Sequence, residues 1–361
     1  MDMQKRWIIL FVALLSISFL GLFYSGHEGV FTDIDSNLNF ADIAWMITAT
    51  IFVLMMTPGL SFFYGGMVRS KNVISTMLQS FIAMGVISVI WVVVGFSLAF
   101  GEDVGHFIGN PGTFFMFVNV GGATDKLLAP TIPLALYALF QMKFAIITPS
   151  LITGSFAERV RFSGYLVFMI LFCIFVYCPL AHWTWHPDGF LRQMGVLDFA
   201  GGIVVHASSG VAALAGAIFL GRRKESGQPA NIPFVLLGAA MLWLGWFGFN
   251  AGSSLAANSI AVKAFLNTNT ASATAMMTWV VFDCLRGRKP SAMGAAIGAV
   301  VGLVAITPSA GYVTVGESIF IALVVTVICN MAVSWKNKKN SFDDALDVFP
   351  THGVGGIVGT I

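Results

Sequence analysis

The chain has 361 residues, of which 57% are hydrophobic and only 10% are charged, with a formal net charge of +2. Soluble globular domains carry about a quarter of their residues as charged side chains, so this composition excludes that class. A mean hydropathy of +0.85 supports the same conclusion. The sequence contains no clustered basic and aromatic patch of the kind that binds nucleic acid.

The first predicted element is residues 1–24. Lys5 and Arg6 precede an apolar stretch from Trp7 to Tyr24, and a polar segment follows. This order is typical of a secretory signal peptide. No small-residue cleavage site follows, so an uncleaved N-terminal membrane anchor is the alternative. We favour the cleaved signal, which leaves residues 25–361 as one membrane domain.

Continuous apolar segments separated by short polar breaks follow, and they predict membrane-spanning helices. Because these runs do not alternate apolar with polar residues, they exclude a closed β-barrel. The predicted spans are 41–66, 73–99, 131–157, 162–181, 199–221, 233–254, 271–284, 291–307 and 315–335, and a tenth begins near Phe349.

The basic residues predict the orientation of these spans. Most of the nineteen lysines and arginines lie at the N-terminus and in every second loop, whereas the intervening loops hold only Lys126, Arg192 and Lys263. Basic loops face the cytoplasm, so the mature N-terminus is expected outside a cell (inner) membrane. An odd number of helices in the first half then inverts the second, which predicts a 5+5 inverted-repeat helix bundle.

One pattern occurs twice, in the equivalent fifth and tenth helices. Asp198 precedes His206 by the same spacing as Asp344 precedes His352. At about 1.5 Å per residue, each histidine is expected roughly 12 Å inside its helix, close to the middle of the bilayer. Because the two helices run in opposite directions, the imidazoles can meet. Ionisable residues at this depth are functional candidates, here as a pore lining.

Simpler structural roles are the alternatives. The histidine pair could only hydrogen-bond and hold the two halves together. Asp198 and Asp344 are predicted to cap the first helical turns. A direct binding role for Asp198 is the lesser alternative.

Several stretches of this sequence resemble the ammonium transporter (Amt/Mep/Rh) family, and its microbial branch more than the Rh proteins. The resemblance extends from residue 41 almost to the end. The matching stretches are Ala41–Trp45, Pro58–Gly66, Lys71–Val73, Phe156–Arg159, Asp198–Gly202, Gly245–Ser253 and Asp347–Gly353.

The resemblance implies a homotrimer in which eleven helices surround a narrow pore in each subunit. It implies an outer ammonium-binding vestibule at Trp185, Ser253 and Phe144. It places the gate at Phe144 and Phe249, above the twin histidines. For each of these aromatic residues, anchoring at the membrane interface is the alternative. Ammonium or ammonia is the implied substrate, with no cofactor, no metal and no enzymatic activity.

Two features depart from the family pattern. Lys143 directly precedes the gate residue Phe144, where a neutral residue is usual. Either it faces a subunit interface and pairs with an acid, or its charge repels the substrate and slows conduction. The chain also ends at Ile361, so the eleventh helix is missing from it.

We therefore expect this sequence to be a piece of a longer chain, and a second function stays open. An ammonium channel-transporter is the first expectation. The alternative is an ammonium sensor with little or no flux, coupled to a cytoplasmic signalling domain or regulatory protein.

Overall fold

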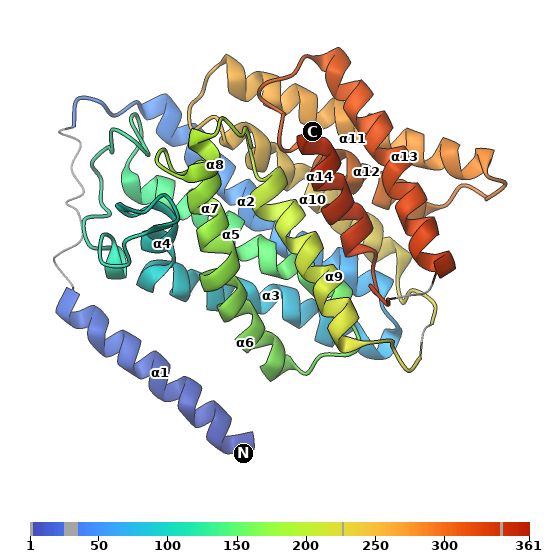
Figure 1. The fold of residues 1–361 in the computed structure, drawn as a ribbon, viewed down its shortest axis with the longest axis horizontal. Coiled ribbons are helices and arrows are strands. Elements are labelled where there is room, and N and C mark those ends of the chain that lie inside the picture. The colour runs from blue at the N-terminus through green and yellow to red at the C-terminus, as the bar shows by residue number, and fades with distance from the viewer. Residues whose placement is uncertain (1–2, 25–34, 226, 340–341) are drawn as a thin grey trace.

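The computed structural model describes residues 3–24, 35–225, 227–339 and 342–361 of the chain. Long helices packed side by side form almost all of it (Figure 1). Within the described residues, seven helical segments are long and apolar enough to cross a membrane. The predicted all-α membrane class is confirmed, whereas the count of five helices in each half stays a prediction.

The first half of the chain combines α-helices with wider π-helical turns. η2 (Trp91–Gly95) joins α3 to α4, η4 (Cys173–Tyr177) joins α6 to α7, and η5 (Gly202–Ala207) leads into α9. The α-helices are α1 (Met3–Tyr24), α2 (Phe40–Met67), α3 (Val73–Ile90), α4 (Phe96–Phe100), α5 (Leu134–Phe156), α6 (Phe162–Phe172), α7 (Cys178–Trp185), α8 (Phe190–Gln193) and α9 (Ser208–Leu220). The short elements are η1 (Ser70–Asn72), β1 (Asp103–Val104), β2 (Ile108–Gly109) and η3 (Phe115–Phe117).

Among the described residues, the second half consists of four long helices and a final short one. Its helices are α10 (Ile232–Gly252), α11 (Ser259–Leu285), α12 (Ala292–Ile306) and α13 (Val315–Lys339), followed by the π-helical turn η6 (Phe349–Val354) and α14 (Gly355–Thr360). α1 lies along the outside of the bundle (Figure 1), where the Trp7 ring lies 6.4 Å from that of Phe162. Whether residues 1–24 are a signal or an anchor stays a prediction.

Glycine brings α2 and α10, the first helices of the two predicted halves, into close contact. A Cβ atom on Gly238 would lie 2.2 Å from the backbone nitrogen of Phe63 and 2.6 Å from the carbonyl oxygen of Gly59. No side chain fits in that space, so the two backbones touch directly. Small residues allow the same close approach between membrane helices in general.

The two histidine-bearing helices also cross at glycine. A Cβ atom on Gly210 would lie 2.1 Å from the Cα atom of Gly353. Each helix begins with a six-residue π-helical turn that contains its histidine, η5 for His206 and η6 for His352. The crossing therefore brings two widened turns together in the centre of the bundle.

Two predicted boundaries were wrong. α11 begins at Ser259, not near 271, because hydropathy missed its polar first half. In that half, Asn267 donates hydrogen bonds to the carbonyls of Ala310 (2.9 Å) and Val313 (2.8 Å), so a polar residue is satisfied inside the bundle. The fifth helical segment begins at Gly202, so Asp198 lies before it and His206 lies only four residues from its start, not roughly 12 Å inside.

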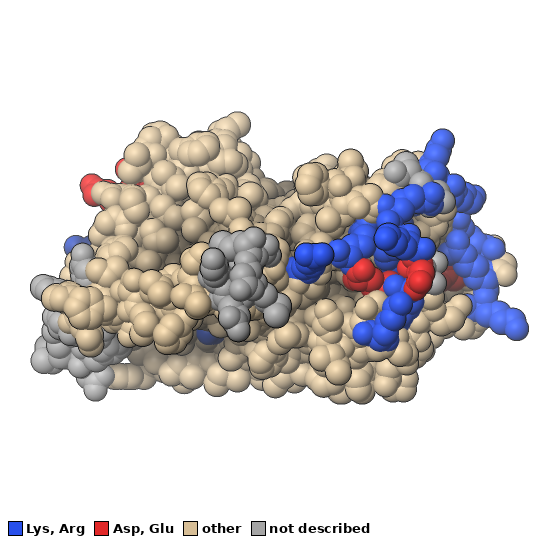
Figure 2. All heavy atoms as spheres, turned by 90° about the horizontal axis from the view of Figure 1, so that it is seen from below, with Lys and Arg blue, Asp and Glu red and all other residues tan. Residues whose placement is uncertain are grey.

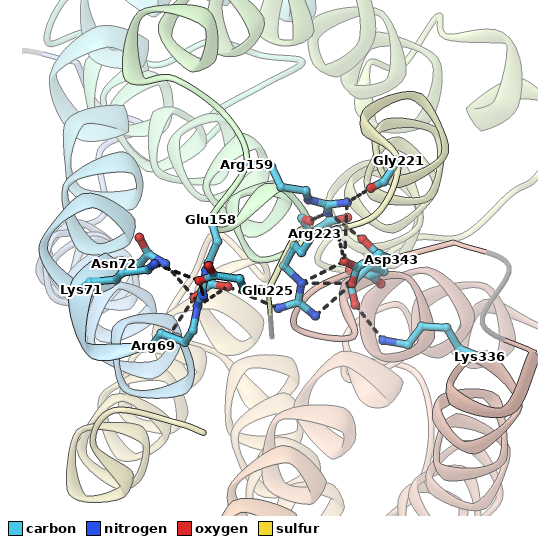
Figure 3. Close-up of polar contacts among 12 residues, drawn as sticks. Arg69, Lys71, Asn72, Glu158, Arg159, Gly221, Arg223, Glu225, Lys336 and Asp343 are labelled. Atoms are coloured by element: carbon cyan, nitrogen blue, oxygen red, sulfur yellow. Dashed lines mark hydrogen bonds and ion pairs between the residues drawn. The ribbon is translucent and has the colours of Figure 1, made fainter. Parts of the chain in front are cut away.

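Ion pairs connect the loops at the end of the bundle where the basic residues lie (Figure 3). Glu158 accepts hydrogen bonds from the backbone and guanidinium of Arg69, both at 3.0 Å. Arg159 binds the backbone carbonyls of Ser155, Gly221 and Asp343. Arg223 forms a close ion pair with Asp343 at 2.9 Å. This network fixes the loop that precedes η6 relative to the ends of α5 and α9.

Candidate functional site

A polar cavity of about 310 Å³ lies between the ends of α5, α7 and α10. Its lining includes three of the residues predicted for an outer vestibule, Phe144, Trp185 and Ser253. We call it the vestibule. The full lining is Tyr137, Gln141, Phe144, Trp185, Arg192, Asp198, Phe199, Ser253, Ser254, Leu255, Ile260 and Tyr312.

Asp198 fixes one wall of the vestibule. Its carboxylate accepts hydrogen bonds from four consecutive backbone N–H groups, those of residues 201–204, at 2.7 to 3.2 Å. This geometry requires a left-handed backbone at Gly201 (φ +112°), which favours glycine. Burial raises the pKa of Asp198 above its usual range, and the four hydrogen bonds oppose that rise. The backbone oxygen of Asp198 accepts the indole N–H of Trp185 at 2.9 Å, which orients the ring.

Two stacked rings close the floor of the vestibule. The centroids of Phe144 and Phe249 lie 4.2 Å apart with an interplanar angle of 27°. Trp185 meets Phe144 edge-on at 5.7 Å. Ser253 lies one turn after Phe249 and donates its hydroxyl proton to the Phe249 carbonyl at 2.8 Å, so the lone pairs of its oxygen remain available to accept.

Beneath the rings lies a second, much smaller cavity of about 10 Å³. Its walls are apolar except for His206 and His352, and Phe249 forms part of its roof. We call it the histidine cavity. The lining is Met56, Leu60, Phe63, Ile147, Leu151, Val205, His206, Leu242, Trp246, Phe249, Val300 and His352. A volume of this size accommodates roughly one water molecule.

The structure brings the two predicted histidines together. Their Nδ1 atoms lie 3.3 Å apart, and both side chains are buried. At this separation one Nδ1 donates a proton and the other accepts it. The Nε2 atom of His206 has no hydrogen-bond partner among the described residues. Trp246 stacks on the same imidazole at 5.3 Å and directs its own N–H to Thr307.

The remaining predicted residues lie outside both cavities. Asp344 accepts the backbone N–H of Phe349 at 2.7 Å, before the start of η6. Lys143 lines neither cavity, although its neighbour Phe144 does. Its ammonium nitrogen lies 3.8 Å from the sulfur of Met142, and no carboxylate within the described residues pairs with it.

Among the vestibule residues that sequence reasoning missed, Gln141 is the one with an unsatisfied polar atom. The carbonyl oxygen of the Gln141 side chain is buried without a hydrogen-bond partner in the described residues, and Gln141 lines the vestibule. An unsatisfied buried acceptor is costly, so it indicates a donor that arrives with a ligand or water. The available signal was its position, three residues before Phe144 on the same face of α5.

The fold and site together define a class. A membrane-spanning bundle that holds a larger chamber with polar groups, a closed aromatic constriction and a small, mostly apolar chamber has the features of a membrane channel or transporter.

Comparison with known proteins specifies the class further. Residues 44–361 match the model of the Ammonium Transporter Family. The chain is 47% identical over 326 residues to the "Putative ammonium transporter" of Methanothermobacter thermautotrophicus, covering 90% of this chain and 79% of that protein. The chain therefore belongs to the ammonium transporter family.

Solved structures agree with this assignment. The crystal structure of Candida albicans Mep2 superposes with a TM-score of 0.85 at 38% sequence identity, covering 91% of this chain and 73% of that one. A structure described as "Sensor Amt Protein" superposes with a TM-score of 0.82 at 31% identity, covering 89% and 81%. The family therefore includes at least one structural neighbour that is described as a sensor.

Proposed function

We propose that this protein conducts ammonium by binding NH4⁺ in the vestibule and passing NH3 through the histidine cavity. The observation that carries the proposal is the pair of unequal chambers, about 310 and about 10 Å³, separated by the Phe144–Phe249 stack. The first chamber carries polar groups and is large enough for a hydrated cation, whereas the second is small and almost entirely apolar.

The vestibule offers the interactions that an ammonium ion needs. The rings of Trp185 and Phe144 supply aromatic faces, each worth about 0.5–2 kcal/mol to a cation. The oxygens of Ser253 and Gln141 can accept its N–H groups. The carboxylate of Asp198 is occupied by hydrogen bonds from backbone N–H groups, so Asp198 acts here as a positioning residue for Trp185.

Passage below the stacked rings favours the neutral species. A cation in this apolar cavity would cost several kcal/mol, because no ring of carbonyls replaces its water. Ammonium can release its proton to water on the vestibule side of the stack, and the NH3 that remains is small enough for the histidine cavity. There the free Nε2 of His206 interacts with the ammonia, while the shared proton between the imidazoles keeps them in place.

Ammonium flux into proteoliposomes tests the proposal. We expect His206→Ala/His352→Ala to lose selectivity for ammonium over potassium and to change the flux at least tenfold, because the polar part of the cavity disappears. His106→Gln alters an exposed histidine outside both cavities and should leave flux unchanged. Wild-type rate and selectivity in the double variant would overturn the role of the pair.

The second candidate function is ammonium sensing with little flux. Two observations favour it: the structural similarity to a "Sensor Amt Protein", and the buried Lys143 beside the gate residue. Recording on solid-supported membranes separates the functions. Sustained currents that scale with protein content support transport, whereas a small, saturating charge displacement supports sensing. If the charge of Lys143 slows conduction, Lys143→Met should raise the current several-fold.

The assembly and orientation belong to the same proposal. We infer a homotrimer in the cell (inner) membrane, with the mature N-terminus outside and the basic loops in the cytoplasm. A cytoplasmic signalling domain or regulatory protein would meet the basic loops. Chemical crosslinking that stops at three subunits, and labelling of a cysteine at Lys338 only from the inside, are the expected results.

A further inference from the structure

A basic cavity on the opposite face from the vestibule has no part in the proposed ammonium path. It has a volume of about 470 Å³ and is lined by Arg222, Arg223, Lys224, Lys336, Asn337, Phe342 and Asp343. We call it the basic pocket. It lies where the loop after α9 meets the last turn of α13 and the loop before η6.

The charges of the basic pocket are only partly neutralised. Arg223 is paired with Asp343, and Lys336 lies 2.6 Å from a carboxylate oxygen of Asp347. Arg222 and Lys224 have no hydrogen bond or ion pair within the described part of the chain, and both are exposed. Figure 2 shows that most of the visible lysines and arginines gather at one end of the molecule around a few carboxylates. Two cations without a partner in the described residues therefore line this cavity. They lie beside the ion-pair network that Figure 3 shows around Arg223 and Asp343.

Exposed apolar side chains flank the basic pocket on both helices that lead to it. Phe219, at the end of α9, is 89% exposed, and Ile218 before it is 64% exposed. Trp335, directly before Lys336 on α13, is 48% exposed, and its ring lies 6.1 Å from that of Phe342. The apolar surface ends where the charges begin, on helices that span the membrane.

Unpaired cations beside exposed apolar side chains favour the binding of an amphipathic anion. The guanidinium fork of Arg222 and the ammonium of Lys224 match phosphate oxygens, while the apolar flank matches acyl chains. The cytoplasmic leaflet holds anionic lipids, and basic residues at its surface attract them. A free phosphate would bind the charged groups but make no contact with the rings of Phe219 and Trp335. We propose that the basic pocket binds the phosphate headgroup of an acidic phospholipid of the cytoplasmic leaflet, with its chains along Phe219 and Trp335.

Quenching of Trp335 fluorescence tests the proposal at the site itself. The full chain is placed in nanodiscs of phosphatidylcholine with increasing fractions of brominated phosphatidylglycerol. The contribution of Trp335, one of nine tryptophans, is obtained by subtracting the Trp335→Phe variant. We expect half-maximal quenching at a low mole fraction of brominated phosphatidylglycerol, and no such preference with brominated phosphatidylcholine.

Matched variants locate the effect. Arg222→Gln/Lys224→Gln should raise the mole fraction needed for half-maximal quenching about tenfold, because two surface cations are lost. Arg161→Gln/Lys289→Gln removes two exposed cations on the same face, unpaired in the described residues and outside the pocket, and should change nothing. Arg222→Lys/Lys224→Arg keeps the charge and should retain the preference, which guards against a folding defect.

Three results would overturn the proposal. The first is equal quenching by both lipids. The second is an equal loss of the quenching preference in Arg222→Gln/Lys224→Gln and Arg161→Gln/Lys289→Gln. The third is binding of inorganic phosphate without acidic lipid, measured by phosphorus-31 NMR, that Arg222→Gln/Lys224→Gln weakens in the same way. The last result would assign the pocket to a soluble anion. None of these readouts depends on ammonium flux, so the inference stands or falls separately from the proposed function.

Discussion

The two helices that carry the histidines begin with the same sequence spacing but are held in place differently. On the vestibule side, Asp198 binds four backbone N–H groups and leaves no carboxylate oxygen free. On the side of the basic loops, Asp344 accepts the N–H of Phe349, and its Oδ1 atom has no hydrogen-bond partner in the described residues. A lysine, Lys336, approaches from α13 and donates to the Asp344 carbonyl at 2.7 Å. The start of η5 is held by hydrogen bonds between one carboxylate and the backbone, whereas the start of η6 also depends on the charged side chain of Lys336.

This difference shows that the same acid–histidine spacing in two helices does not imply that the two aspartates contribute equally to stability. The four N–H groups at Asp198 hold a rigid turn behind Trp185, which suits a wall that must keep one shape. The start of η6 instead joins the ion-pair network of the loops, so its position is coupled to α9 and α13 through Arg159 and Lys336. The start of η6 is therefore held by contacts with several neighbouring elements, whereas that of η5 is held by one carboxylate.

The largest expected effect is at Asp198. Replacement of Asp198 by alanine leaves four buried N–H groups unpaired and should lower the free energy of unfolding by about 4 kcal/mol or more, since hydrogen bonds to charged groups contribute about 1.5–3 kcal/mol each. Asp344→Ala should cost only about 1 kcal/mol on the same basis. Apparent melting temperatures of the detergent-solubilised variants measure the difference, which we expect to be roughly 5–10 °C. Equal shifts would refute the contrast.

The glycine crossing gives the next largest effect. Gly210→Ala places a methyl group on the backbone of Gly353, so the two histidine helices must separate, at a cost of about 3 kcal/mol. The same movement would part His206 from His352 and reduce ammonium flux. Gly316→Ala, at a helical glycine with open space around it, is the matched control and should leave both melting temperature and flux unchanged. A tolerated Gly210→Ala would mean that the crossing can widen without cost.

Much of the fold followed from hydropathy, because long apolar helices such as α2 and α10 must be buried in lipid or protein. α11 was mispredicted because Asn267 is satisfied by carbonyls from a distant loop, which no local pattern reveals. The repeated acid–histidine spacing correctly brought His206 and His352 together. It did not reveal the π-helical turns, because these depend on how Asp198 gathers the N–H groups of the turn.

Gln141 illustrates what local patterns cannot provide. A glutamine in an apolar helix usually points to a partner in the bundle, and nothing in the sequence says that its oxygen faces an empty chamber. Lys143 is the converse case. Its charge made it a candidate in the sequence, but the residue lines neither chamber.

The smallest expected effect is a pH dependence of the stability that arises from Asp344 and distinguishes it from Asp198. Burial raises the pKa of Asp344 from 3.8 to about 6, with Asp347 adding to the rise, while Lys336 and the backbone N–H groups oppose it. The folded protein therefore binds this proton more tightly than the unfolded chain. Its contribution to the free energy of unfolding is greatest below about pH 4 and falls as the pH rises to about 6.

Replacement by asparagine removes this titration. Asp344→Asn should flatten the decline in melting temperature between pH 4 and 6 and be more stable than the wild type at pH 7, by on the order of 1–3 kcal/mol. Asp347→Asn provides the comparison. Burial also raises the pKa of Asp347, against its ion pair with Lys336 at 2.6 Å, so this variant should flatten the same decline. A decline of unchanged slope in Asp344→Asn would show that the unpartnered carboxylate oxygen is hydrated. The start of η6 would then be as fully satisfied as that of η5, and the contrast between the two helices would disappear.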